Sequence, residues 1–345
     1  MNGESPQSET QMSERVTWLL SVKDGMPYLP ETLASIEAQT YPDWEVFAWV
    51  NGSSDGTLEE LQRWIPSRLP GRIIADRPST YGEAVGTMIA QSETELCALI
   101  HADDVNAPER LERQVAFLKA HPEVALVGSR YDVIDDESRP VPGGGPGHGY
   151  TRHDDIVHVM MMESPLGCPT VLFRRSAALE AGNHRHIPFV EDYDLWMRLA
   201  LRHKLASLNE FLLHYRVHPR SATVWATAAN LVVPAAAACF ARNAPPLYGL
   251  SSEEALRLRE QRHPFALPAL WRVARHLSRT QGGTTPGRFF SRSFVQGARG
   301  LIKPTDLISR VPMTFLAYWR SPRRFALLLR RRVMARLRHQ APKLG

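Results

Sequence analysis

Three mainly apolar runs stand out along the chain, and each is followed by a stretch in which apolar positions recur at helical spacing. The runs cover residues 16–22, 44–50 and 96–100. Runs of this kind are typical of parallel strands buried on both faces, because helices cover both sides of such a sheet. Strands that alternate with helices in this way predict an α/β domain with a mostly parallel sheet.

The remaining elements continue this alternation as far as residue 215. Further strands are predicted at 72–75, 124–129, 133–136, 170–173 and 205–215, with 133–136 at an edge of the sheet. Helices are predicted at 30–39, 58–65, 83–91, 108–120, 154–162 and 189–201. The segment 140–149 holds five glycines and three prolines. We therefore expect a loop there, either a plain linker or a lid beside a cleft.

The stretch 222–241 carries no charge and lies between Arg220 and Arg242. Its length would suit a membrane span, but most of its apolar residues are alanine and Pro234 interrupts it, so we favour a packing helix. Beyond it, helices are predicted at 267–278, 301–320 and 322–338. The sequence thus predicts a disordered N-terminus at 1–14, an α/β domain at 15–222 and a helical, basic extension at 223–345.

Charge is distributed unevenly along the chain. Residues 262–345 hold 18 of the 41 basic residues and a single acid, Asp306, which leaves 23 basic and 35 acidic residues before them. Residues 1–261 therefore carry a net charge of −12, and the tail, residues 262–345, carries a net charge of +17. A basic tail of this kind indicates contact with an anionic surface, although it could also be merely solvated. We favour a membrane over both a solvated tail and nucleic acid, because no nucleic-acid-binding motif accompanies it. Three widely spaced cysteines favour a reducing, cytoplasmic compartment.

Two adjacent carboxylates follow the buried run 96–100, in the sequence His101-Ala-Asp103-Asp104. Ligands of α/β folds bind beyond the carboxyl ends of the strands, and carboxylate oxygens are suitable ligands for Mg²⁺ or Mn²⁺. The same two acids could instead cap the helix that begins near Pro108. On these residues alone, both interpretations stay open.

A second acidic group, Glu191, Asp192 and Asp194, opens the helix predicted at 189–201. Acids in a first turn suit the helix dipole, which is the structural interpretation. The functional interpretation is that one of them faces the cleft as a general base. In addition, the turn 51–57, Asn-Gly-Ser-Ser-Asp-Gly-Thr, exposes backbone N–H groups that could approach a nucleotide closely.

Seven motifs in register resemble the family 2 glycosyltransferases with the GT-A fold, over about residues 15–222. They are Ser21-Val-Lys-Asp-Gly, Gln39-Thr-Tyr-Pro-Asp-Trp-Glu, Asn51-Gly-Ser-Ser-Asp-Gly-Thr, His101-Ala-Asp-Asp, Pro169-Thr-Val-Leu-Phe-Arg-Arg, Glu191-Asp-Tyr-Asp-Leu-Trp and Tyr215-Arg-Val-His-Pro. The resemblance implies a Rossmann-like, mostly parallel sheet flanked by helices. It also implies an enzyme that inverts the configuration of the transferred sugar.

The resemblance assigns roles to the acidic residues. Asp103 matches the last acid of an Asp-x-Asp motif that holds a divalent ion, Mn²⁺ or Mg²⁺, against the donor diphosphate. Asp192 matches the catalytic base and is paired with Glu191. His218 matches a histidine that helps with the metal or the diphosphate.

Donor contacts are implied for the residues that follow the first strands, Ser21, Lys23, Asn51 and Asp55, and for His101. The chain departs from the family pattern at His101, which replaces the first acid of Asp-x-Asp, at Val50 and Asn51, which replace two acids, and at Gly86, which replaces an asparagine. An amide at position 51 offers a donor as well as an acceptor, so these departures affect nucleotide preference.

We therefore expect a metal-dependent glycosyltransferase that uses a nucleotide-sugar, with UDP-sugars preferred. Its acceptor would be a hydroxyl of a glycan or lipid-linked saccharide in bacterial surface polysaccharide or glycolipid assembly. We expect a cytoplasmic protein held at the inner membrane face through its tail. Two alternatives remain, a catalytically silent GT-A-like binding module at the membrane and a nucleotidyltransferase.

Overall fold

The structure, a computed structural model, describes residues 14–75, 77–142, 150–260 and 267–281. Its sheet has the strand order β3-β2-β1-β4-β7-β6-β8-β5. The strands are β1 (Val16–Val22), β2 (Trp44–Val50), β3 (Gly71–Ile74), β4 (Leu96–Ile100), β5 (Val105–Asn106), β6 (Val124–Ile134), β7 (Leu172–Arg174) and β8 (Lys204–Arg216). The helices are α1 (Leu29–Glu37), α2 (Thr57–Trp64), α3 (Tyr81–Gln91), α4 (Arg110–Ala120), α5 (His153–Val159), α6 (Arg175–Glu180), α7 (Glu191–Leu199), α8 (Ala222–Ala228), α9 (Val232–Tyr248), α10 (Ser252–Glu260) and α11 (Leu267–Thr280), with a 3₁₀ turn, η1 (Cys168–Thr170).

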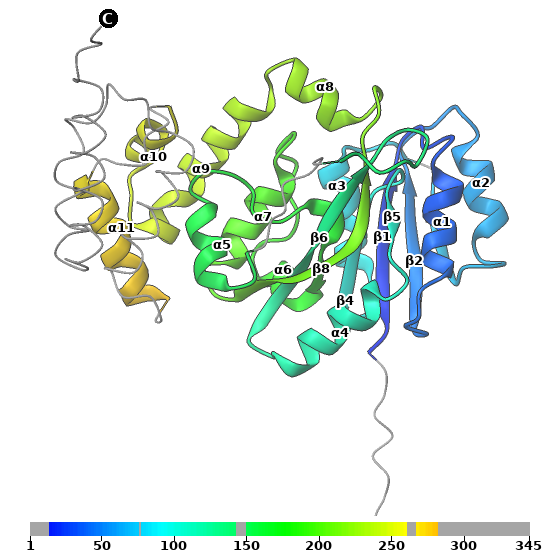
Figure 1. Ribbon diagram of the computed structural model, residues 1–345, viewed down its shortest axis with the longest axis horizontal. Helices are drawn as coiled ribbons and strands as arrows, with labels where there is room; N and C mark the ends of the chain where they lie inside the picture. The colour runs from blue at the N-terminus through cyan, green and yellow to red at the C-terminus, as the bar shows by residue number, and fades with distance from the viewer. Residues whose placement is uncertain (1–13, 76, 143–149, 261–266, 282–345) are drawn as a thin grey trace, which may run out of the picture. The chain divides into compact units, whose positions relative to one another are not determined.

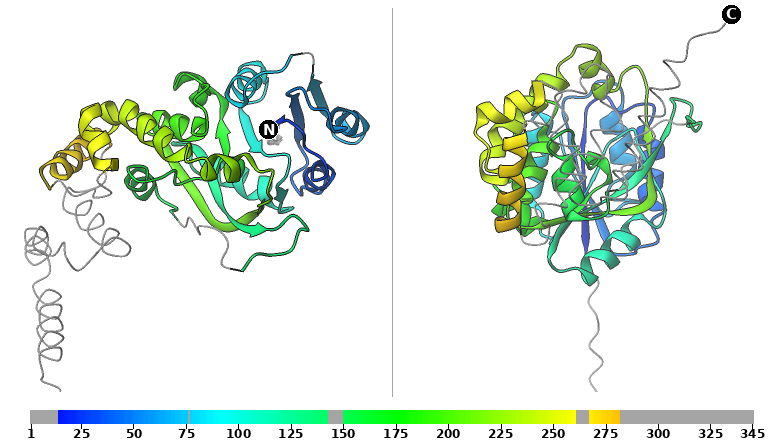
Figure 2. Two further views of the ribbon diagram at one scale, coloured as in Figure 1. Left: turned by 90° about the horizontal axis from the view of Figure 1, so that it is seen from above. Right: turned by 60° about the vertical axis from the view of Figure 1, so that its left-hand side comes forward.

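The sheet is mixed but mostly parallel, as the apolar runs predict. Strand β1 pairs in parallel with β2 and β4, and β2 pairs in parallel with β3. Antiparallel β7 lies between β4 and β6. Helices cover both faces of the sheet (Figures 1 and 2), so β1 and β4 are buried along their whole length. The predicted α/β class and the bounds of β1, β2 and β4 are confirmed.

Helix α3 approaches the segment before α7 very closely. A Cβ atom added to Gly82 would lie 2.5 Å from the carbonyl oxygen of Arg185, and one added to Gly86 would lie 2.7 Å from that of His184. Neither position leaves room for a side chain. The amide of Asn183 donates to the Gly86 carbonyl oxygen at 2.7 Å. This contact gives a physical reason for a glycine at position 86, where the family pattern has an asparagine.

Several sequence-based expectations are wrong. The edge strand predicted at 133–136 is the end of β6, which lies inside the sheet between β7 and β8. Register shifts between Val124 and Tyr131 interrupt the ladder with β8. They break the apolar alternation of the sequence there, which is why it predicts two strands instead of one. The packing helix predicted at 222–241 is two helices, α8 and α9. Strand β5 and helices α6 and α10 have no counterpart in the prediction.

The chain divides into two compact units, Met1–Leu247 and Tyr248–Gly345. The first contains the sheet, and in the second the structure describes α10 and α11. The domain boundary predicted at residue 222 stays a prediction. The N-terminal segment 1–13, most of the glycine-rich loop 140–149 and the helices predicted at 301–320 and 322–338 lie outside the described residues.

Candidate active site

The candidate site lies where the parallel strands β1, β2 and β4 end. Their carboxyl ends share one edge of the sheet, because all three run in the same direction. Three polar segments follow them, Lys23–Asp24 after β1, Asn51–Thr57 after β2 and His101–Asp104 after β4. This edge is where ligands bind in open α/β sheets, as the sequence predicts.

The carboxylate of Asp103 is held at this edge by the end of β8. Its Oδ2 lies 3.0 Å from Nε2 of His218, whose ring centre lies 4.6 Å from that of Tyr28. Burial by itself would raise the pKa of Asp103, but the hydrogen bond from His218 holds that pKa below its ordinary value. Asp103 is therefore ionised at neutral pH. The structure thus brings together two residues that the resemblance assigns to metal binding.

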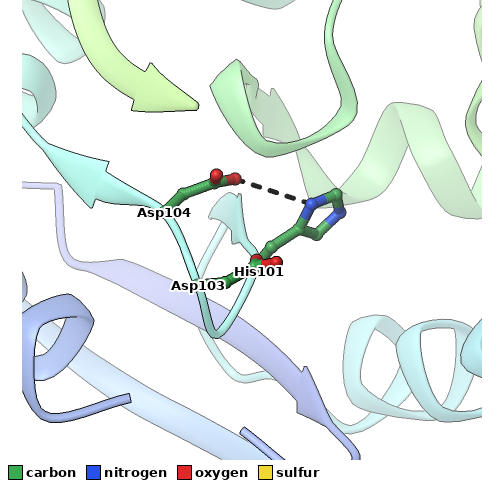
Figure 3. Close-up of side chains that lie close together, drawn as sticks. All are labelled: His101, Asp103 and Asp104. Atoms are coloured by element: carbon green, nitrogen blue, oxygen red, sulfur yellow. Dashed lines mark ion pairs between the residues drawn. The ribbon is translucent and has the colours of Figure 1, made fainter. Parts of the chain in front are cut away.

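Asp104, next along the chain, is fully buried. Its Oδ1 accepts the backbone N–H of Arg216 at 2.9 Å, while Oδ2 has no hydrogen-bond partner and lies 3.6 Å from Nδ1 of His101 (Figure 3). Burial and then the charge of Asp103 raise the pKa of Asp104 well above its ordinary value. These contacts do not support the capping interpretation, because Asp104 is engaged by β8 rather than by α4.

His101, Asp103 and Asp104 together form a group that fits a divalent cation. Their ligand atoms all lie within 4.8 Å of one another. Burial lowers the pKa of His101, so its imidazole is neutral, which is the form that ligates metals. The Oδ2 atom of Asp104, buried without a hydrogen-bond partner, is an unmet acceptor beside the ionised Asp103. The residues present therefore fit Mn²⁺ or Mg²⁺.

The sequence analysis missed Arg216, which holds this group in place. The side chain is 1% exposed. Its guanidinium donates to the carbonyl oxygens of Asp103 at 2.8 Å and Asp135 at 3.0 Å, and pairs with the carboxylate of Glu31. One arginine thus ties the loop after β4 to α1 and to the turn after β6. The signal in the sequence was its place within the motif Tyr215-Arg-Val-His-Pro.

We expect Arg216→Met to lower the free energy of unfolding by about 3 kcal/mol, because removing the buried guanidinium leaves the carbonyl oxygens of Asp103 and Asp135 without their donor. A urea titration followed by circular dichroism measures this loss. The matched control is Arg220→Met, because Arg220 is exposed, donates to the carbonyl oxygen of Met26 at 2.9 Å and lies 5.8 Å from the Tyr28 ring. Equal stability of the two variants would contradict the anchoring role of Arg216.

The three acids at the start of α7 fall into two classes. Asp194 is fully buried, lies 2.7 Å from Arg198 in an ion pair and accepts a hydrogen bond from Asn243 of α9 at 2.9 Å. It is a structural residue. Burial raises the pKa of Asp192 to about 6, and burial together with the charge of Asp192 raises that of Glu191 to about 7. Acids with such values can exchange protons near neutral pH.

A tyrosine and a cysteine that the sequence analysis did not single out connect the two acidic groups. The Tyr81 ring lies 6.0 Å from that of His101, and its hydroxyl lies 3.3 Å from Sγ of Cys168. Burial raises the pKa of both Tyr81 and Cys168, and the charges of Asp192 and Glu191 raise each further. The α7 acids are therefore electrostatic neighbours of the same tyrosine that contacts His101.

The predicted donor-side residues are also at this edge. Nδ2 of Asn51 donates to Oγ of Ser21 at 2.9 Å, and its Oδ1 accepts the backbone N–H of Ser79 at 3.1 Å. Asp55 accepts the backbone N–H of Met26 at 2.8 Å and so shapes the loop itself. Lys23 is exposed beyond β1. Contacts of these four residues with a donor stay predictions.

Comparison with known proteins shows which sequences this chain resembles. Residues 19–180 match the family model described as glycosyl transferase family 2. The amylovoran biosynthesis glycosyltransferase AmsE of Erwinia amylovora is 27% identical over 190 residues, which are 54% of this chain and 70% of that protein. The O-antigen biosynthesis glycosyltransferase WbnJ of Escherichia coli is 23% identical over 212 residues, which are 60% of this chain and 82% of that protein.

Two solved structures share the fold. The mannosyltransferase PcManGT from Pyrobaculum calidifontis, in complex with GDP-Man and Mn²⁺, superposes with a TM-score of 0.53 at 18% identity, over 88% of this chain and 84% of that chain. S. aureus TarS 1–349, in complex with UDP-GlcNAc, gives 0.52 at 15% identity, over 89% and 92%. At these identities the likeness concerns the fold alone.

Proposed function

Because residues 19–180 match the glycosyl transferase family 2 model, we propose that the protein is an inverting, metal-dependent glycosyltransferase. Its donor is a nucleoside diphosphate sugar, with UDP-sugars preferred. Its acceptor is a hydroxyl group of a glycan or lipid-linked saccharide used in surface polysaccharide or glycolipid assembly. The protein would act on the cytoplasmic side of the membrane.

The observation that carries the proposal is the pair of acidic groups around Tyr81. One is the ionised Asp103 beside His101 and His218, and the other is Asp192, whose pKa burial raises to about 6. A displacement at the anomeric carbon of a sugar needs charge stabilisation on the leaving side and a base on the attacking side. A protein with only one acidic group would supply only one of these.

The relatives support the same assignment. The names of AmsE and WbnJ connect these proteins with amylovoran and O-antigen biosynthesis. TarS has been crystallised with UDP and with UDP-GlcNAc, and PcManGT with GDP-Man and Mn²⁺. We take the UDP complexes as the reason to prefer UDP-sugars here, and the Mn²⁺ complex as support for a divalent cation.

In the proposed reaction, His101, Asp103 and Asp104 would hold Mn²⁺ or Mg²⁺. When bound, the cation neutralises the negative charge that develops on the departing nucleoside diphosphate. Asp192 accepts the proton of the acceptor hydroxyl as its oxygen bonds to the anomeric carbon. The bond between that carbon and the phosphate oxygen breaks in the same step, so the configuration inverts.

A panel of sugar nucleotides tests this function. We expect one class of donor, at about 100 times its dissociation constant, to stabilise the protein by about 2.7 kcal/mol, which raises the melting temperature by several degrees. EDTA should abolish the shift and added Mn²⁺ should restore it. Release of nucleoside diphosphate, followed by chromatography, reports turnover. Release of pyrophosphate would indicate a nucleotidyltransferase. No shift of the melting temperature and no release of nucleoside diphosphate with any donor would indicate a binding module.

A further inference from the structure

An exposed, uncharged ridge projects beside the candidate site. It consists of residues 222–234, which include α8 and the start of α9, and we call it the α8 ridge. Val233 is 68% exposed and Trp225 is 59% exposed. The exposed large hydrophobic side chains of the described residues are Val141, Phe189, Phe211, Val217, Val224, Trp225, Leu231 and Val233. Four of these eight lie on the α8 ridge, Val217 precedes it by five residues, and Phe189 contacts it.

The α8 ridge is too short to cross a bilayer. No helix in the described part of the chain has the length and apolarity of a membrane span, and α8 and α9 meet that test only as a pair bent by 94°. The second half of α9 is packed inside the protein, since Cys239 and Phe240 are buried. The apolar surface left outside is therefore shallow, and seven-residue α8 is about 10 Å long.

The α8 ridge is attached directly to the candidate site. Oγ of Ser221 accepts the backbone N–H of His218 at 3.3 Å. The Trp225 ring lies 6.0 Å from that of Phe189, which precedes Glu191 by two residues. Figure 1 shows α8 on the side of the sheet toward which β1 runs. The ridge thus borders the site near the α7 acids, from which an acceptor would enter.

The chemistry of the α8 ridge favours a lipid surface over a protein. Residues 221–241 contain no charged side chain, and exposed arginines, Arg220 and Arg242, flank them. A tryptophan, aliphatic side chains and threonines suit the boundary between head groups and acyl chains, into which interfacial segments sink by about 5–10 Å. Arg220, two residues before the ridge, matches a lipid phosphate.

We propose that the α8 ridge docks into the interface of an anionic bilayer and so presents the site to a lipid-linked acceptor. The identity of the acceptor rests on the proposed function, whereas docking itself does not require sugar transfer. This contact is separate from the basic tail. It depends on apolar burial, so it persists in salt that screens the attraction between the tail and the membrane.

The test is flotation of the full chain with vesicles of phosphatidylcholine and phosphatidylglycerol in about 0.5 M NaCl, where exposed charges are screened beyond a few ångströms. We expect the wild type to float and the double variant Trp225→Ser/Val233→Ser to partition at least about ten-fold more weakly, because it buries less apolar area. The matched control is Val141→Ser/Phe211→Ser, which alters two exposed hydrophobic residues away from the ridge. All three proteins carry the same tail.

Three results would overturn the proposal. The first is equal flotation of the two double variants, and the second is no flotation of the wild type. The third is a wild-type dimer, seen by sedimentation velocity, that the ridge variant does not form while neither protein binds vesicles, because a second copy would then cover the ridge. Donor-induced thermal shift, measured in parallel, separates the two ideas. If the shift fails while flotation succeeds, the enzymatic function fails and the docking stands.

Discussion

Replacing Asp103 with asparagine is expected to reduce sugar transfer by about 10³-fold, or about 4 kcal/mol of transition-state stabilisation. The amide keeps the size of the side chain and can still accept the hydrogen bond from His218, but it carries no charge. The site then lacks its ionised cation ligand. Initial rates of nucleoside diphosphate release, measured over a Mn²⁺ titration, show whether the loss comes with weaker dependence on the metal.

The matched control is Asp43→Asn, the same substitution just before β2, at the opposite edge of the sheet. We expect its activity to stay near that of the wild type. If Asp103→Asn retained activity within about ten-fold of the wild type, charge at this position would not be needed, since the loss of a catalytic charge interaction typically exceeds that factor.

Replacing Asp192 with asparagine is expected to abolish transfer to a similar degree, by about 10³-fold, while donor binding is retained. The reason is that Asp192 is on α7, away from the group around Asp103, and would act only on the acceptor proton. Product formation and donor-induced thermal shift, measured on one preparation, separate the two effects. Glu191→Gln serves as the neighbouring comparison and should lose less. Weakened donor binding in Asp192→Asn would contradict this division of roles.

The pH dependence of the wild type gives a second test of Asp192. Burial raises its pKa to about 6, so the carboxylate is protonated below that pH and cannot accept a proton from the acceptor. Transfer should therefore fall as pH drops through about 6 and reach a plateau above about 7, where Glu191 has also ionised. The residual activity of Asp192→Asn should lack the limb near 6. An unchanged limb in that variant would assign it to another group.

Much of the sheet could be predicted because its central strands are buried on both faces. The bounds of β1, β2 and β4 coincide with the ends of their apolar runs. Strand β6 could not be predicted in the same way, because Arg130, Tyr131 and Asp132 are only partly buried and shifts of register break their alternation. Likewise, the exposure of α8 could not be distinguished from burial, since alanine and valine suit both.

Residues of the candidate site could be predicted where they belong to a sequence motif. They could not be predicted where their role depends on packing against distant parts of the chain. The sequence points to Asp103 and Asp192, but a buried arginine looks the same in a sequence as a solvated one. The partners of Arg216 lie far away along the chain, in α1 and after β4. The structural role of Asp194 could have been inferred, because Arg198 stands four residues later on the same helix.

The hydrogen bond from Asn243 to Asp194 has a consequence for anyone who truncates this protein. It comes from α9, more than sixty residues after the region that matches the family, yet it secures the helix that carries Asp192. An expression fragment that stopped at the last recognisable motif, near residue 222, would leave the Asp194–Arg198 pair without its amide. A soluble fragment chosen by homology alone could thus be folded and inactive, and its C-terminus is better placed at Leu247, where the first unit ends.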